Sequence, residues 1–173
     1  MLVKRAMSKN VVSVSVPGNR EKVLDLMRKE DKAVLPVVKG DTKQLVGLIT
    51  RSDLIVNPDE EQIAILMSTD LVTASPDDDV ADVAKKMIDN NVRRVPVVDD
   101  NGDLVGIITS FDLVSNALIK LESDDPVENF MITTVPTTWY KTPLNVAFET
   151  MKQFGLKSVL ALNDSAKLVG ILT

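Results

Sequence analysis

The chain has 173 residues, of which 45% are hydrophobic and 26% charged, with a net charge of −5 and neither cysteine nor histidine. Such a chain can bury a core, but the missing side chains exclude disulfides, thiolate nucleophiles, the usual zinc sites and imidazole acid–base chemistry. Because these groups are missing, the chain is not expected to be an enzyme. The acidic charge disfavours a nucleic-acid surface, and since no apolar run reaches the about 20 residues of a membrane span, the sequence predicts a cytoplasmic protein.

One pattern occurs three times along the chain, at residues 46–53 (VGLITRSD), 105–112 (VGIITSFD) and 169–173 (VGILT). A methionine precedes each glycine at a similar distance, at Met7, Met67 and Met131. Repetition at a period of about sixty residues defines the architecture, and units of that size share a core with a neighbour. The sequence therefore predicts three units, at residues 1–60, 61–124 and 125–173.

The first unit is expected to contain a helix followed by a hairpin. Val23, Leu24 and Met27 recur at helical spacing and predict one buried stripe. The apolar runs 35–38 and 46–49 flank a turn at Lys39-Gly40-Asp41 and predict two largely buried strands.

The second unit shows the full pattern. Residues 72–74 predict a short strand, 75–79 a helix-capping turn, 95–98 and 104–108 a hairpin around Asn101-Gly102, and 112–118 a closing helix. The first helix is expected to bury Val80, Val83, Ala84, Met87 and Ile88. Each unit is thus β-α-β-β-α, and the strand prolines Pro36 and Pro96 require an edge or a place where no ladder bond is needed.

The third unit follows the same order with two departures. Leu144, Ala147, Phe148 and Met151 predict its helix, and Asn163-Asp164-Ser165 its hairpin turn. Leu160 replaces the strand proline, and the sequence reaches Thr173 before any closing aspartate, so the unit is expected to be truncated and to lack a closing helix. Trp139 and Tyr140 precede the helix and are expected to form a buried anchor.

These marks resemble those of the CBS domain family, named from cystathionine β-synthase. The marks are a strand of the form apolar-Pro-apolar-Val followed by Gly-apolar-apolar-Thr-x-x-Asp, and they occur in order at 35–38 with 47–53 and at 95–98 with 106–112. The resemblance covers the whole chain. It implies an α/β fold of sandwich-like α+β units, two of which pair through their sheets as a Bateman module. It also implies that the clefts between paired units bind adenosine-containing ligands.

The Thr-x-x-Asp motif suits a nucleoside. A carboxylate at a helix start can accept hydrogen bonds from both ribose hydroxyls, a role that falls to Asp53 and Asp112. Thr50 and Thr109 stand three residues earlier and can donate to a phosphate near the exposed N–H groups of the helix. Backbone groups around Pro36, Pro96, Ser13 and Thr73 are expected to read the edge of the adenine ring.

The same spacing also fits a capping box, in which threonine and aspartate only fix the start of a helix. Spacing alone favours the capping interpretation, the family resemblance favours nucleotide contact, and one aspartate can do both.

Basic residues near the motif are candidate phosphate contacts. Arg93 and Arg94 begin the Pro96 strand, and guanidinium groups suit phosphate; the alternative is a solvated pair of little energetic value. Arg51 and Ser52 lie inside the first motif, whereas Ser110 and Phe111 lie inside the second, so the two sites are not expected to be equivalent.

The sequence therefore predicts a regulatory module that binds AMP, ADP or ATP and acts on another protein, with no catalytic residue, cofactor or metal assigned. The alternatives are a sensor of S-adenosylmethionine or another adenosyl ligand, and an unliganded assembly scaffold. A hydrolase is disfavoured because the acidic clusters 77–79 and 99–100 lie in turns, where acids are ordinary. An odd unit with an apolar sheet needs a cover, which predicts a homodimer through the third unit.

Overall fold

The computed structural model describes residues 1–118 and 125–173, and the chain divides into two compact units, Met1–Glu122 and Ser123–Thr173. The first unit contains the first two repeats and the second contains the third. No helix among the described residues is both long and apolar enough to cross a bilayer.

Repeat one has a three-stranded sheet in the order β1-β2-β3. Its elements are η1 (Val3–Arg5, a 3₁₀ helix), β1 (Val14–Val16), α1 (Arg20–Lys29), β2 (Val34–Lys39), β3 (Leu45–Thr50) and α2 (Arg51–Val56). Pro36 is buried in the central strand, but β1 pairs only with residues 37–39 of β2, so Pro36 lies beyond that ladder and its missing N–H is not needed there. The hairpin turn holds Gly40 at a φ of 53°.

Repeat two contains α3 (Ile63–Leu66), α4 (Val80–Asp89), β4 (Arg94–Val98), β5 (Leu104–Thr109) and α5 (Ser110–Leu118). Asp79 caps α4, since its Oδ1 accepts from the Ala81 N–H at 2.9 Å, as expected of the 75–79 turn. The expected strand at 72–74 is wrong in extent, because only Ala74 forms a bridge, with Val97. Ile88 is also not a core residue: it is 79% exposed.

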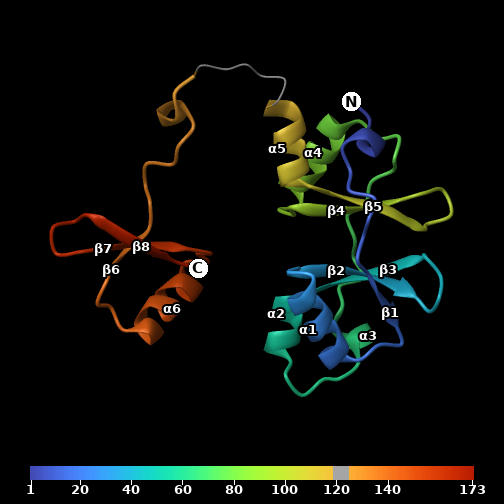
Figure 1. Cartoon of the computed structure of the whole chain (residues 1–173), viewed down its shortest axis with the longest axis horizontal. Coiled ribbons are helices and arrows are strands. Elements are labelled where there is room, and N and C mark those ends of the chain that lie inside the picture. The colour runs from blue at the N-terminus through green and yellow to red at the C-terminus, as the bar shows by residue number, and fades with distance from the viewer. Residues whose placement is uncertain (119–124) are drawn as a thin grey trace. The chain divides into compact units, whose positions relative to one another are not determined.

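Figure 1 shows the layers of the first unit: the sheet β1-β2-β3 and the hairpin β4-β5 face each other between α1 and α2 on one side and α4 and α5 on the other. The N-terminal part of each repeat crosses to the other repeat. Val3 and Ala6 belong to the core of repeat two, whereas Ile63 and Leu66 belong to the core of repeat one. We call residues 3–8 and 63–68 the exchange segments.

A methionine and a glycine meet at the end of each exchange segment. A Cβ added to Gly106 would lie 2.5 Å from the Met7 sulfur, and one added to Gly47 would lie 2.5 Å from the Met67 sulfur. Next to these contacts, Ser8 forms a two-bond backbone bridge with Ile107 (2.9 and 3.0 Å), and Ser68 forms one with Leu48 (both 2.9 Å). Only glycine allows the crossing chain to approach the strand this closely.

Repeat three contains η2 (Val127–Asn129), β6 (Thr137–Trp139), α6 (Leu144–Gln153), β7 (Val159–Leu162) and β8 (Leu168–Leu172), with sheet order β6-β7-β8. Ala147 and Met151 of α6 are buried, as expected, but Leu144 and Phe148 are 60% and 47% exposed. The expectation of a buried aromatic anchor is wrong: Trp139 and Tyr140 are 48% and 45% exposed. Trp139 donates instead to the Asp164 carboxylate at 2.8 Å.

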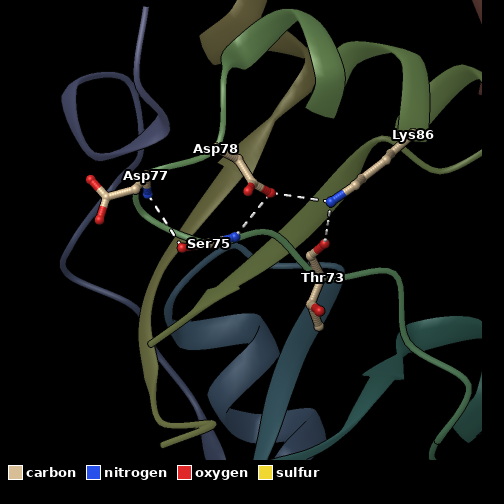
Figure 2. A network of polar contacts seen from close by, with 5 residues as sticks. All are labelled: Thr73, Ser75, Asp77, Asp78 and Lys86. Carbon is tan, nitrogen blue, oxygen red and sulfur yellow. Dashed lines mark hydrogen bonds and ion pairs between the residues drawn. The ribbon is translucent and has the colours of Figure 1, made fainter. Parts of the chain in front are cut away.

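A polar network joins the segment before α4 to that helix (Figure 2). The Lys86 ammonium donates to the Thr73 carbonyl at 3.4 Å and to Asp78 Oδ2 at 3.1 Å, and Asp78 Oδ2 also accepts from the Ser75 N–H at 3.1 Å. The Ser75 N–H and then the Lys86 ammonium lower the pKa of Asp78 below its ordinary value, against the opposing effect of burial.

Replacing Ile63 with alanine tests the exchange. Ile63 is fully buried in repeat one, so Ile63→Ala should lower the free energy of unfolding by about 2–5 kcal/mol. Ile65→Ala is the matched control on the same short helix, where the side chain is 65% exposed, and should change it by less than about 0.5 kcal/mol. Urea denaturation of the full chain measures both; equal effects would contradict the crossing.

Replacing Asp78 with asparagine tests the network. A lowered pKa means that the ionised carboxylate stabilises the folded state at neutral pH and that this contribution is lost as the pH falls below about 4. Asp78→Asn should therefore cost about 1 kcal/mol at pH 7, because the pair is partly exposed, and progressively less in acid. Urea denaturation at several pH values, with Asp100→Asn in the exposed hairpin turn as control, measures this; a deficit that grew in acid would show the opposite linkage.

Candidate functional site

The Thr-x-x-Asp motif closes a capping box at the start of α5. Thr109 N–H and Oγ1 donate to Asp112 Oδ2 at 2.8 and 2.6 Å, and the Asp112 N–H donates back to Thr109 Oγ1 at 3.2 Å. The capping interpretation of the sequence is therefore correct for this motif.

The cap uses only one carboxylate oxygen. Within the described residues, both protein donors bond to Asp112 Oδ2, which leaves Oδ1 able to accept from a ligand. The Thr109 hydroxyl proton is already donated to that carboxylate, so the expected donation to a phosphate would require this bond to break. Asp112 can thus cap the helix and bind a diol at once, whereas Thr109 mainly positions it.

A cavity of about 210 Å³ lies beside this motif and is built from both repeats. From repeat two come Thr109, Asp112, Ile107 and Arg94, and from repeat one come β2 and the chain after the first exchange segment. The lining from repeat one consists of Ser8, Asn10, Val11, Val12, Lys32, Val34, Leu35 and Pro36. The exchange thus brings two parts of repeat one to the carboxylate of repeat two.

Cations outnumber the carboxylate in this cavity. Arg94 begins β4 directly opposite Thr109 of β5, so the two side chains leave the same face of the hairpin. Lys32 reaches the cavity from repeat one, immediately before β2. Both basic residues are exposed, whereas Asp112 is half-buried and the lining residues Leu35 and Pro36 are buried.

The first motif has the same cap but different neighbours. Thr50 N–H and Oγ1 both donate to Asp53 Oδ2 at 2.8 Å, at the start of α2. Val34 stands opposite Thr50, where the second hairpin has Arg94 opposite Thr109. Arg51 donates to the Lys32 carbonyl at 3.3 Å, and Ser52 is exposed.

The structure does not bring every candidate residue to the Asp112 cavity. Thr73 lies in the network of Figure 2, and Pro96 is buried in β4 opposite Ile107. Arg93 and Ser110 line an apolar groove of about 460 Å³ together with residues of α4 and α5. Ser13 lines a hollow of about 640 Å³ beside α1. Of the sequence candidates, the cavity contains Pro36, Arg94, Thr109 and Asp112.

Sequence reasoning missed Lys32 and Asn10. Neither belongs to a repeated mark, since Val92 and Asp70 occupy the matching places in repeat two. The signal that could have found them is the exchange itself, which places the chain just after Met7 against the hairpin of the other repeat.

Comparison with known proteins agrees with this architecture. The family model for the CBS domain matches residues 3–58, 61–118 and 127–173. Protein MJ1404 of Methanocaldococcus jannaschii is 29% identical over 175 residues, which cover 99% of this chain but 41% of that protein. The chain spans less than half the length of several curated relatives that it matches.

Two solved structures share the fold. The CBS domain pair of protein MJ0100, crystallised with 5′-methylthioadenosine and S-adenosyl-L-methionine, superimposes with a TM-score of 0.63 at 32% identity, covering 70% of this chain and 98% of that one. Protein MJ1225 of Methanocaldococcus jannaschii superimposes with a TM-score of 0.80 at 21% identity, covering all of this chain and 69% of that one. With repeats, motif and fold in agreement, the chain belongs to the CBS domain family.

Proposed function

We propose that the first unit is a regulatory module that binds an adenine nucleotide, AMP, ADP or ATP, in the Asp112 cavity. One observation carries this proposal: a single cavity combines the Asp112 carboxylate, whose Oδ1 accepts no bond from the described residues, with apolar side chains of repeat one and two exposed cations. Each part suits one portion of a nucleotide.

The ribose belongs at Asp112. Its Oδ1 accepts the hydroxyl protons of the diol while Oδ2 keeps the helix cap, so binding does not cost the fold its cap. The adenine ring belongs against Val11, Val12 and Val34, where it removes apolar surface from water. Its edge would meet the β2 backbone near Pro36, which lies beyond the part of β2 that pairs with β1.

The phosphates belong at Lys32 and Arg94. The cavity, at about 210 Å³, is smaller than the about 300–1,000 Å³ of typical ligand sites, so it would enclose only part of a nucleotide. The phosphates therefore extend toward solvent past the two cations, where a guanidinium and an ammonium attract them. We expect the first phosphate to account for most of the affinity that the phosphates add.

A second adenosyl ligand has a specific observation in its favour. The CBS pair of MJ0100, at 32% identity, is crystallised with 5′-methylthioadenosine and S-adenosyl-L-methionine. Both lack phosphate and would use the ribose and adenine contacts of the Asp112 cavity. 5′-Methylthioadenosine has no charge for the cations, whereas S-adenosyl-L-methionine would bring them a carboxylate. An uncharged thioether ligand that binds as tightly as AMP would favour this candidate.

The Thr50–Asp53 motif, with Arg51, Ser52, Pro96 and Thr73, is proposed as a second and weaker site. It has the same free carboxylate geometry, but Val34 replaces the arginine opposite its threonine. A ligand in either site contacts both repeats, so occupancy changes how the repeats are held together, which is the basis for regulating a partner protein.

Asparagine at position 112 tests the ribose contact. Asp112→Asn keeps an oxygen for the cap but replaces the other oxygen with an NH₂ group, which cannot accept a ribose proton. Each lost charged hydrogen bond costs about 1.5–3 kcal/mol, so AMP affinity should fall at least tenfold while the melting temperature changes little.

The matched variant is Asp53→Asn, which makes the same change in the other capping box. It should reduce AMP affinity at the Asp112 cavity by less than threefold in calorimetric titration. If both variants bind AMP as the wild type does, the motifs are helix caps only and AMP binds elsewhere. A wild type that does not bind AMP would favour the scaffold alternative.

Glutamine at positions 32 and 94 tests the phosphate contact. Lys32→Gln and Arg94→Gln should each weaken AMP about tenfold and leave 5′-methylthioadenosine within twofold, because only AMP has charge for them to bind. Isothermal titration of both ligands measures the contrast. Equal losses for the two ligands would assign these residues to the shape of the cavity instead.

A further inference from the structure

The third repeat has a counterpart of the exchange segments that the described residues leave exposed. Residues 127–132 correspond in sequence to 3–8 and 63–68, so Val127, Phe130 and Met131 match Ile63, Leu66 and Met67. Ile63 and Leu66 are 0% and 9% exposed, whereas Val127, Phe130 and Met131 are 76%, 73% and 54% exposed. Apolar side chains that are buried twice in this chain lie in water the third time.

The third repeat also has an open apolar cavity where such a segment could bind. In repeat one, Val23, Met27 and Leu35 form one cluster with Ile63 and Leu66. Their counterparts Ala147, Met151 and Val159 line an open cavity of about 300 Å³. A segment entering there would meet an apolar wall with room for side chains.

The glycine on the receiving strand is open as well. A Cβ on Gly47 or Gly106 would meet a methionine sulfur at 2.5 Å, but one on Gly170 would meet nothing within 4 Å. Ile171, the counterpart of Leu48 and Ile107, is 60% exposed, and Ile132, the counterpart of Ser68 and Ser8, is 79% exposed. The two backbone segments that such a bridge would join, at Ile132 and Ile171, are therefore both exposed.

The segment 127–132, here called the donor, and the cavity beside α6, here called the receiver, have matching side-chain sizes. The donor carries Phe130 where the other segments carry Leu66 and Ala6, and the receiver carries Ala147 where the others carry Val23 and Val83. The large Phe130 of the segment is thus matched by the small Ala147 of the cavity. The segment of one copy therefore fits the cavity of a second copy of the same chain. A surface that carries both halves of one contact is self-complementary around a two-fold axis.

We propose that two copies of this chain pair through their third repeats by exchanging residues 127–132. Val127 and Phe130 of each copy enter the cavity beside α6 of the other, and Met131 covers Gly170 of the other. Backbone bonds between Ile132 and Ile171 complete the contact, as Ser8 and Ile107 do between repeats one and two. The proposed interface between two copies thus has the same form as the exchange between repeats one and two within the first unit.

Valine at position 170 tests the proposal on the full chain. At micromolar concentration the wild type should show twice the mass of one 18.9 kDa chain in sedimentation velocity. Gly170→Val blocks the methionine without disturbing its own repeat, where the space is open, and should weaken dimerisation at least tenfold. Phe130→Asp, on the donor side, should do the same.

Ile88→Asp is the matched control. It adds a charge to the apolar groove between α4 and α5, a different exposed apolar surface, and should leave the dimer intact. A dimer that Ile88→Asp dissociates and Gly170→Val does not would place the interface on those helices and overturn the proposal. A wild-type mass of one chain would overturn it too, and protection of residues 127–132 from protease in that monomer would show that another part of the same chain covers them.

A disulfide locates the contact directly, since the chain has no cysteine of its own. A mixture of Met131→Cys and Gly170→Cys chains should form a linked dimer on oxidation, while either variant alone should not. Met7→Cys with Gly106→Cys in one chain is the reference pair, because the Met7 side chain already lies against Gly106. Linkage by either single variant at the rate of the mixture would contradict the two-fold exchange.

Discussion

The fold depends on a reciprocal exchange of short apolar segments between two repeats. Each repeat leaves a gap in its own core, which the other fills with two apolar side chains, Val3 and Ala6 in one direction and Ile63 and Leu66 in the other. The exchange is possible because Gly47 and Gly106 carry no Cβ where the crossing methionines lie. Neither repeat is complete alone, so the pair folds as one unit, in keeping with the small size of each repeat.

The same exchange forms the candidate site. The chain that leaves Met7 passes the hairpin of repeat two, and this places Asn10, Val11 and Val12 opposite Asp112. The carboxylate caps α5 with Oδ2, and in the proposed site a ligand would use Oδ1, so helix stability and ligand binding would not compete for the same atom. The two motifs are alike in the cap and differ in the residue opposite the threonine, which is Val34 in the first and Arg94 in the second.

The sequence predicted much of this architecture from repetition and periodicity. The helices at Val23 and Val80 and the hairpins around Gly40 and Gly102 are present as expected, because those patterns are local. The CBS family and the mixed α/β fold are confirmed.

Partners of the exchange segments were not predictable, since repetition shows that Met7 and Met67 are equivalent but not that each crosses to the other repeat. Lys32 was also missed, because it reaches the cavity through tertiary packing and its counterpart in repeat two, Val92, is not basic. Ile88 and Trp139 were misplaced because apolar spacing and aromatic character predict burial without showing whether a neighbour covers the side chain.

The central claim is that one ligand site is built from both repeats of the first unit. Titration of AMP into the isotope-labelled full chain, followed by amide NMR shifts, tests it most directly. The account predicts that Val11, Val12 and Lys32 of repeat one shift together with Thr109 and Asp112 of repeat two, at one common midpoint. Shifts confined to one repeat, or none at millimolar AMP, would contradict it.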